Sequence, residues 1–250
     1  DEPAKIKVIG VGGGGGNAVN HMYHQGIGGV SFVLCNTDAQ ALRNSPVPVK
    51  VQLGAKGEGA GNIPEVAKKL AEESAAEVEA LFDDNTRMAF ITAGMGGGTG
   101  TGAAPVVARI AKEKGVLTVG IVTIPFLFEG EPKILQAFAG VEEMRKHVDA
   151  LLVINNERLC KIYPDLSWTT AFAKADDSLS NAARSIAELV SKDGKINLDF
   201  ADVRTTLKDG GAAVISTGSG EGEHRMSRAI QNALTSPLLK ESDIYGAERV

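Results

Sequence analysis

The fold of this chain is decided by the stretch Gly94-Met95-Gly96-Gly97-Gly98-Thr99-Gly100-Thr101-Gly102. An apolar run at 88–91 precedes it and predicts a buried strand, and the Ala/Val-rich segment 103–114 predicts a helix with Pro105 in its first turn. Glycines at a strand-to-helix turn let backbone N–H groups approach a ligand, and the helix N-terminus adds positive dipole potential. A tight turn alone needs one or two glycines, whereas this stretch has six. It therefore predicts a phosphate-binding loop.

Composition narrows the class of protein. The 250 residues allow one large domain or two modest ones, and a net charge of −5 gives no electrostatic reason to expect nucleic acid or an anionic membrane as a direct partner. Cys35 and Cys160 form neither a disulfide framework nor a zinc pattern, which favours a reducing cytoplasm. Apolar runs stay well short of the roughly 20 residues that span a bilayer. We therefore expect a soluble intracellular protein.

A second glycine run occupies 12–16 and is followed by Asn17. Gly10, Gly12 and Gly15 fit the dinucleotide pattern G-x-G-x-x-G, and Asp38 follows the next predicted strand at about the distance of a ribose-binding acid. This match leaves an NAD-type oxidoreductase open as an alternative. The P-loop pattern G-x-x-x-x-G-K-[ST] does not occur in the sequence, so a Walker-type nucleotidase is not supported.

Predicted strands and helices alternate along most of the chain. Strands are expected at 5–11, 30–35, 47–53, 88–91, 116–124, 150–155 and 212–217. Helices are expected at 18–25, 65–81, 103–114, 133–147, 169–192 and 224–234. This alternation predicts an α/β fold, a Rossmann-like and mostly parallel sheet with helices on both faces. In such sheets ligands bind beyond the carboxyl ends of the strands, where the glycine loops and Asn156 would lie.

The long helix at 169–192 is expected to end at Asp193-Gly194. Asn197-Leu198-Asp199-Phe200-Ala201-Asp202 then forms a polar loop that opens a short helix. Acids favour the first turn of a helix, so Asp199 and Asp202 could be caps rather than catalytic groups. Spacing alone leaves both interpretations open.

These motifs resemble the tubulin/FtsZ GTPase family. The stretch 94–102 resembles the family signature, and 197–202 resembles its catalytic loop. Further motifs resemble the bacterial cell-division branch of the family: Ile9-Gly10-Val11-Gly12 through Asn17, Asn36-Thr37-Asp38, Phe128-Glu129-Gly130 and Ser236-Pro237-Leu238-Leu239. The similarity runs from about residue 5 to residue 250. It implies a self-assembling GTPase of bacterial cell division, which cleaves GTP to GDP and phosphate in the cytoplasm at the division site.

The resemblance implies a role for each matching residue. Backbone donors and one hydroxyl would hold the GTP phosphates: Gly13, Gly14, Gly15, Gly16, Asn17, Gly96, Gly97, Gly98, Thr99 and Gly100. Glu129 and Asn156 would bind the ribose and base region, Phe172 would stack on guanine, and Asp176 would accept hydrogen bonds from its N–H groups.

Lys133 stands where the family usually has arginine, which puts bidentate phosphate contact there in doubt. Asp199 and Asp202, with Asn197, would position the attacking water. Mg²⁺ is expected with GTP, and no metal site made by protein side chains is expected.

The resemblance also implies domains and partners. We expect a GTP-binding domain at 1–168, a central connecting helix at 169–194, and the catalytic loop with the start of an incomplete α+β second domain at 195–250. Partners would be further copies of the chain, head to tail, and membrane-adaptor and regulatory division proteins through a tail absent here. Nucleic acid binding and direct membrane insertion are not expected. The loop 54–61 is shorter than the family's usual version. As an alternative, this chain would be a GTP/GDP-binding module that assembles and hydrolyses poorly.

Helix length adds a mechanistic argument. From Asp176 to Lys192 a helix rises about 24 Å at about 1.5 Å per residue, and Asp199 and Asp202 lie beyond that end. If these carboxylates are catalytic, they must act on a neighbouring copy's nucleotide. Head-to-tail contacts of this kind build open filaments.

Overall fold

A computed structural model of the chain describes residues 5–165, 167–191, 199–216 and 218–234, together with Ala247 and Arg249. The strands are β1 (Lys5–Val11), β2 (Val30–Asn36), β3 (Val49–Gln52), β4 (Thr86–Gly94), β5 (Leu117–Ile124), β6 (Ala150–Asn155) and β7 (Gly211–Ala212). The helices are α1 (Gly12–His24), α2 (Ala39–Arg43), α3 (Pro64–Glu73), α4 (Ala75–Ala80), α5 (Gly98–Glu113), α6 (Glu131–Arg145), α7 (Glu157–Ile162), α8 (Trp168–Ser191), α9 (Phe200–Leu207) and α10 (Arg225–Leu234), with a 3₁₀ turn at Leu127–Glu129.

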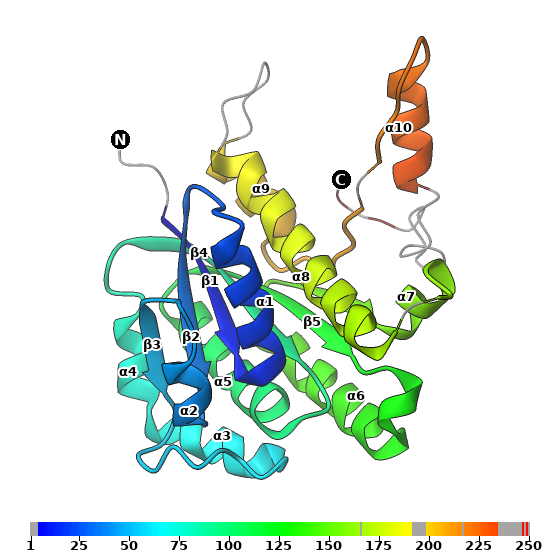
Figure 1. Cartoon of the computed structure of the whole chain (residues 1–250). Coiled ribbons are helices and arrows are strands. Elements are labelled where there is room, and N and C mark those ends of the chain that lie inside the picture. Colours follow the sequence, from blue (N-terminus) through cyan, green and yellow to red (C-terminus); the bar gives the residue numbers. More distant parts are fainter. Residues whose placement is uncertain are drawn as a thin grey trace.

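The strands form one sheet in the order β3-β2-β1-β4-β5-β6-β7 (Figure 1), and each pair of neighbouring strands is parallel. In the centre, Ile9 of β1 lies opposite Val33 of β2 on one side and Ile91 of β4 on the other. Strands added after β1 extend the sheet one way, and strands added after β4 extend it the other way. Ligands bind beyond the carboxyl ends of the strands at such a switch point. The predicted α/β fold with a parallel sheet is confirmed.

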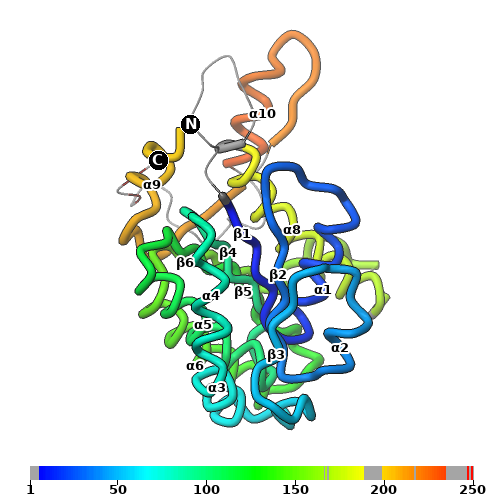
Figure 2. Tube along the Cα trace, turned by 90° about the vertical axis from the view of Figure 1, so that its left-hand side faces the viewer, coloured from blue at the N-terminus to red at the C-terminus, as the bar shows by residue number. Residues whose placement is uncertain are grey.

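Helices cover both faces of the sheet (Figure 2). Helices α3 to α6 pack on one face, and α1, α2 and α8 pack on the other. Helix α9 contributes Phe200 and Val203 to the core under α1 and α8. Along β1, Ile6 and Val8 belong to the core under α1 and α8, whereas Ile9 and Val11 belong to the core under α5. Successive side chains of a strand point to opposite faces, so two apolar cores require the continuous apolar strands that the sequence contains.

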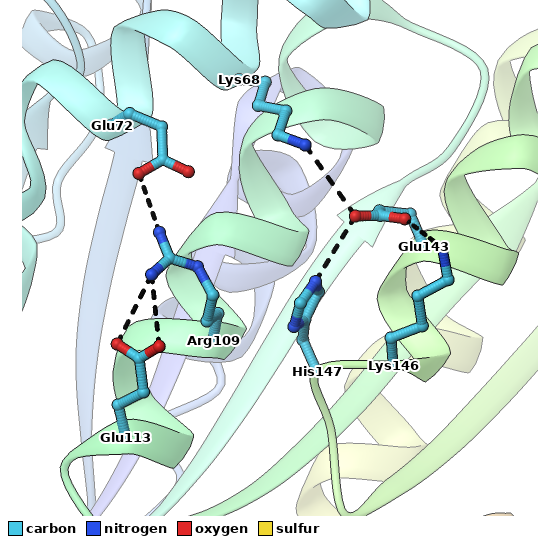
Figure 3. Close-up of polar contacts among 7 residues, drawn as sticks. All are labelled: Lys68, Glu72, Arg109, Glu113, Glu143, Lys146 and His147. Atoms are coloured by element: carbon cyan, nitrogen blue, oxygen red, sulfur yellow. Dashed lines mark hydrogen bonds and ion pairs between the residues drawn. The ribbon is translucent and has the colours of Figure 1, made fainter.

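Surface ion pairs join α3 to α5, the helix that begins within the signature stretch, and α3 to α6 (Figure 3). The Arg109 guanidinium on α5 lies 2.8 Å from Glu72 on α3 and 3.3 Å from Glu113 one turn further along. Lys68 on α3 lies 3.9 Å from Glu143 on α6. Exposed pairs each contribute little to stability, so we assign them a role in the alignment of the three helices rather than in the core.

The helices after both glycine runs begin earlier than predicted. Helix α1 begins at Gly12 rather than at residue 18, and α5 begins at Gly98 rather than at residue 103. Gly12 has a φ of 73°, which glycine adopts without strain, and it turns the chain from β1 into α1. The early start of α5 places Pro105 inside the helix and not in its first turn, so the hydrogen bond to the carbonyl of Thr101 is lost.

Two other predicted elements differ from the structure. The single helix expected at 65–81 is two helices, α3 and α4, that meet at Ser74. The Ser74 hydroxyl accepts a hydrogen bond from the Gly54 amide at 2.9 Å and lies 3.5 Å from the Gln52 carbonyl, which ties the junction to the end of β3. The strand expected at 212–217 is the two-residue strand β7. Thr217 lies outside the described residues.

Helix α8 confirms the predicted long helix. Residue 192, Asp193-Gly194, Asn197 and the motif 236–239 lie outside the described residues. Helix α10 projects from the body of the molecule (Figure 1) and exposes Met226, Ile230 and Leu234. Among the described helices, none combines the length and the apolar character needed to cross a bilayer.

Candidate nucleotide-binding site

The glycine-rich N-termini of α1 and α5 meet where the parallel strands end. We call this end of the sheet, formed by the carboxyl ends of the strands, its carboxyl edge, and the opposite end its amino edge. A methyl group on Gly12 would lie 2.8 Å from the backbone nitrogen of Gly100, and one on Gly14 would lie 3.2 Å from the Cα of Gly94. A side chain at Gly12 would separate the two helix ends, and one at Gly14 would push α1 away from the end of β4. The first N–H groups of each helix have no partner within the helix, and the helix dipole is positive there. The paired helix ends, which we call the cradle, can bind an anion.

Gly13 and Gly98 occupy different surroundings within the cradle. Gly13 is exposed, and a methyl group on it would meet no atom within 4 Å. A methyl group on Gly98 would lie 2.8 Å from the backbone nitrogen of Ile63 and 3.0 Å from the backbone of Asn62. Gly98 therefore permits close packing of the chain before α3 against α5. Gly13 instead borders open space where a ligand can lie.

Thr99 contacts Thr37, a residue of the motif Asn36-Thr37-Asp38 to which the sequence alone assigned no role. Its hydroxyl lies 2.7 Å from the hydroxyl of Thr37, which is 1% exposed in the turn after β2. The Thr37 carbonyl accepts a hydrogen bond from the Gly59 amide at 3.0 Å, and the Gly57 carbonyl accepts one from the Ala39 amide at 3.1 Å. The loop 54–61 is thus attached to the turn that contacts Thr99. The position of Thr37 directly after β2 is the signal that could have identified it.

Aromatic side chains gather beside the cradle, after β5 and on α8. Phe126 is buried and stacks on Phe128 with ring centroids 4.8 Å apart. Phe172 lies edge-on to both rings, at 5.4 and 6.0 Å. Phe172 is 42% exposed, whereas Ala175 and Leu179, at helical spacing on the same face of α8, are buried. An exposed aromatic side chain at this place can stack on a planar base.

Asn156 and Asp176 bring polar groups to the same edge. Asn156 is 5% exposed, and its Oδ1 has no hydrogen-bond partner among the described residues. Burial raises the pKa of the Asp176 carboxyl to about 6, against the lowering effect of His21 and with a further rise from Asp177. A buried acceptor without a partner and a carboxyl with a strongly raised pKa are both unfavourable for folding, and both are typical of binding sites.

Glu129 and Lys133 contact each other at the start of α6. One Glu129 oxygen accepts a hydrogen bond from the Phe126 amide at 3.0 Å, and the other lies 3.3 Å from the Lys133 ammonium. Glu129 is therefore tied to its own turn, and a ribose contact would have to share its oxygens. The Lys133 side chain is 44% exposed and can move toward an anion.

Asp199 and Asp202 open α9, which lies at the opposite edge of the sheet (Figure 1). The helix that they open packs through Phe200, whose ring lies 4.4 Å from the guanidinium of Arg87 near the start of β4. The following strand, β7, pairs with the first residues of β6. From Arg87 to Gly94 a strand rises about 23 Å at about 3.3 Å per residue. The structure thus does not bring these carboxylates to the cradle of the same chain.

Asp199 and Asp202 also cap α9. Asp199 accepts a hydrogen bond from the Asp202 amide at 2.9 Å, and Asp202 accepts one from the Asp199 amide at 3.2 Å, which is a reciprocal capping box. The capping interpretation is confirmed. Each carboxylate has two oxygens, so capping does not prevent a contact with water. Asn197 lies outside the described residues.

Asp38, the acid on which the NAD-type alternative depends, has a structural role. One oxygen of its carboxylate caps α2 and accepts hydrogen bonds from the amides of Gln40 at 2.8 Å and Ala41 at 3.2 Å. Helix capping therefore accounts for Asp38 without a ribose contact.

Comparisons with known proteins agree with this geometry. Residues 5–164 match the Tubulin/FtsZ family, GTPase domain. The chain is 66% identical to Cell division protein FtsZ of Porphyromonas gingivalis, over 99% of this chain and 55% of that protein. It is 48% identical to Cell division protein FtsZ of Aquifex aeolicus, over 99% of this chain and 68% of that protein. The chain thus spans between about half and two thirds of the length of these relatives.

A solved structure gives the same result. An empty FtsZ dimer from M. jannaschii is similar with a TM-score of 0.89 and 45% sequence identity, over 94% of this chain and 69% of that one. The family match begins at β1 and includes both glycine-rich helix N-termini. The chain belongs to the Tubulin/FtsZ family.

Proposed function

We propose that this chain binds GTP in the cradle and cleaves it to GDP and phosphate when a second copy, placed head to tail, brings Asp199 and Asp202 to the nucleotide. One observation carries the proposal: the cradle and the carboxylates lie at opposite edges of the sheet, and from Arg87 to Gly94 β4 alone spans about 23 Å between them. An interface between the carboxyl edge of one copy and the amino edge of the next joins the two halves. Repetition of this heterologous contact builds a filament.

The residues of the cradle divide the work of binding. Backbone N–H groups of 13–17 and 97–100 donate to phosphate oxygens, and Thr99 adds a hydroxyl. The Gly96 N–H instead donates to the Thr101 hydroxyl at 2.9 Å, so Gly96, although named by the resemblance, supports the turn. Phe172 stacks on guanine, while Asn156 and Glu129 bind at the base and ribose. Asp176 accepts from guanine N1–H and N2–H, which adenine cannot supply, and a site built on such contacts rejects the wrong base strongly.

Hydrolysis requires an oriented water and a proton acceptor. A carboxylate of the neighbouring copy, Asp199 or Asp202, accepts the proton as the water oxygen bonds to the γ-phosphorus. The bond from that phosphorus to the β–γ bridging oxygen breaks, and GDP and inorganic phosphate result. Asn197 assists in positioning the water.

Mg²⁺ fits this donor set. It keeps several waters and is usually bound through substrate phosphates with one or two carboxylates, so it needs no protein cage. Within the described ranges there is no cluster of three or more His, Cys, Asp or Glu side chains that could hold a metal. When bound with GTP, Mg²⁺ would neutralise phosphate charge.

Family membership and the names of the relatives support a role in bacterial cell division, in the cytoplasm at the division site. We propose filament formation by copies of the chain, with membrane-adaptor and regulatory division proteins bound through segments outside these 250 residues.

Binding and sedimentation test the proposed function. The chain should bind GTP at least tenfold more tightly than ATP, and it should sediment with GTP and not with GDP. Equal affinity for ATP and GTP would refute the nucleotide assignment. Tight GTP binding without sedimentation at any concentration favours the alternative, a binding module that no longer assembles.

A further inference from the structure

The side-chain amide of Gln136 donates hydrogen bonds to the backbone of the signature stretch from the side of α6. Gln136 is half-buried on α6, and its Nε2 donates to the carbonyl of Gly96 at 3.0 Å and to the carbonyl of Gly97 at 3.2 Å. The carbonyl of Asn62, in the segment before α3, lies 3.5 Å from the same nitrogen. One amide group thus contacts the backbone of two segments that surround the N-terminus of α5.

Peptide geometry turns these contacts into an orientation. In a planar trans peptide the carbonyl and the N–H of the next residue point in opposite directions. Because the carbonyls of Gly96 and Gly97 point toward α6, the N–H groups of Gly97 and Gly98 point away from α6. An anion is attracted to N–H groups and repelled by carbonyl oxygens, so this orientation decides whether the stretch can bind phosphate.

The backbone at this point needs such a support. Gly96 has a φ of 104°, a conformation that residues with a Cβ rarely adopt, and Gly97 follows it directly. Consecutive glycines have the largest backbone freedom of any residues, so their peptide planes can rotate unless hydrogen bonds fix them.

We propose that Gln136 is a positioning residue for phosphate binding, which fixes the peptides of Gly96 and Gly97 so that the cradle presents N–H groups to the phosphates of the nucleotide. The role rests on the proposed GTP site and assigns Gln136 no contact with the ligand. Its signature is phosphate-specific: the affinity for the phosphorylated nucleotide depends on Gln136, and the affinity for the nucleoside does not.

Two variants distinguish the effect of the Gln136 N–H donor from the effect of the side chain's shape. Gln136→Leu removes the donor, and Gln136→Glu keeps the shape but places acceptor oxygens against two carbonyls. Both residues are good helix formers, so α6 should be retained. Gln25→Glu serves as the charge-matched control, because Gln25 follows α1 at the amino edge, where it contacts His21 and Arg184.

Affinities for GTP and for guanosine are measured by titration, with thermal melting as a check of folding. We expect Gln136→Leu to bind GTP about tenfold more weakly, from the loss of two hydrogen bonds, and Gln136→Glu to bind it more weakly still. Guanosine affinity should stay within about twofold for every variant, and Gln25→Glu should match the parent for both ligands.

Two results would overturn the positioning role. One is GTP affinity within twofold of the parent for both Gln136 variants. The other is an equal loss of GTP and guanosine affinity, which would show general damage to the site. Failure of the parent chain itself to bind GTP is a distinct result, which would refute the proposed function.

Discussion

The two edges of the sheet offer different chemical groups: backbone amides at the carboxyl edge and side-chain carboxylates at the amino edge. At the carboxyl edge the cradle is made of backbone, with glycines packed so closely that a methyl group on Gly12 would lie 2.8 Å from the Gly100 nitrogen. At the amino edge, exposed carboxylates of Asp199 and Asp202 open α9. Backbone N–H groups can hold a phosphate but cannot accept a proton, whereas carboxylates can accept a proton but repel phosphate. The proposed reaction therefore needs groups from both edges.

The carboxyl edge is also more buried than the amino edge. The cradle packs two helix ends into one surface, and Asp176 is buried enough beside α1 to raise its pKa to about 6. Asp199 and Asp202 are exposed, so a second copy can approach them. Under the proposed function, the carboxyl edge determines the affinity for GTP and the amino edge determines the turnover. Substitutions at the two edges should therefore affect different measurements.

The largest expected effect is at Asp202. Asp202→Asn keeps an oxygen that can accept the Asp199 amide, whereas Asp202→Ala removes both the cap and the carboxylate. If Asp202 accepts the proton from water, both variants should lower GTP turnover by about 10²- to 10⁴-fold and leave GTP affinity unchanged. Only Asp202→Ala should also lose about 1 kcal/mol of stability through the cap. Turnover is measured as phosphate release, and stability by denaturant titration. Near-normal turnover in Asp202→Asn would reduce the residue to a helix cap.

A smaller effect is expected at Asp176, on the affinity for GTP rather than on its turnover. Asp176→Asn replaces a charged acceptor for two guanine N–H groups, so GTP should bind about 100-fold more weakly while ATP affinity stays low and unchanged. Competition titration with both nucleotides measures the change. Unaltered GTP affinity would remove Asp176 from the base site.

Asp176→Asn should weaken GTP binding but raise the stability of the chain without nucleotide. In the unfolded chain the Asp176 pKa is near the ordinary 3.8, and in the fold it is raised to about 6. The folded chain therefore holds the proton over a range where the unfolded chain has lost it, and the free energy of unfolding falls as pH rises from about 4 to about 6. Asp176→Asn escapes this loss, so without nucleotide it should melt at a higher temperature than the parent at pH 7.5. The difference should shrink toward pH 4; a difference independent of pH would contradict the pKa assignment.

Gly13 tests where the phosphate lies. Gly13→Ala adds a methyl group in open space at the surface of the cradle, so the fold should be unharmed and GTP affinity should fall by about tenfold. Gly28→Ala is the matched control, because Gly28 also has no atom within 4 Å of an added methyl but lies between α1 and β2 at the amino edge. Titration and thermal melting of both variants are compared. Equal GTP affinities would place the phosphates elsewhere.

The smallest expected effect is at Thr99. Thr99→Ala removes one hydroxyl and its 2.7 Å contact with Thr37, and it should weaken GTP binding by about three- to tenfold. Thr118→Val, which removes a buried hydroxyl from β5 far from the cradle, controls for the loss of a threonine. A loss as large as that of Asp176→Asn would mean that Thr99 also holds the fold of the loop.

The fold was predictable where the signal was local. Apolar runs located the strands of the main sheet, and glycine runs located the turns between them. The starts of α1 and α5 were not predictable, because glycine has a poor helix propensity and packing of Gly12 against Gly100 overrides it. The junction at Ser74 depends on hydrogen bonds to residues about 20 positions away, which no local pattern contains.

The candidate site divides in the same way. Motif residues such as Thr99, Phe172 and Asp176 were identifiable by type and resemblance, and the structure brings them to one edge. The contacts of Thr37 and Gln136 arise from juxtaposition in space, so a single sequence could not reveal them. The separation of Asp199 and Asp202 from the cradle was predictable because helix length sets it.

The central claim, that the active site forms only between two copies, is tested most directly by mixing two defective chains. Asp202→Ala retains the cradle and lacks the acid, whereas Asp176→Ala retains the acid and binds GTP poorly. Each should hydrolyse GTP slowly alone. An equimolar mixture should release phosphate several-fold faster than the sum of the two separate rates, because one kind of junction joins an intact cradle to an intact carboxylate pair. A mixture no faster than that sum, with a parent chain whose specific activity is independent of concentration, would contradict the account.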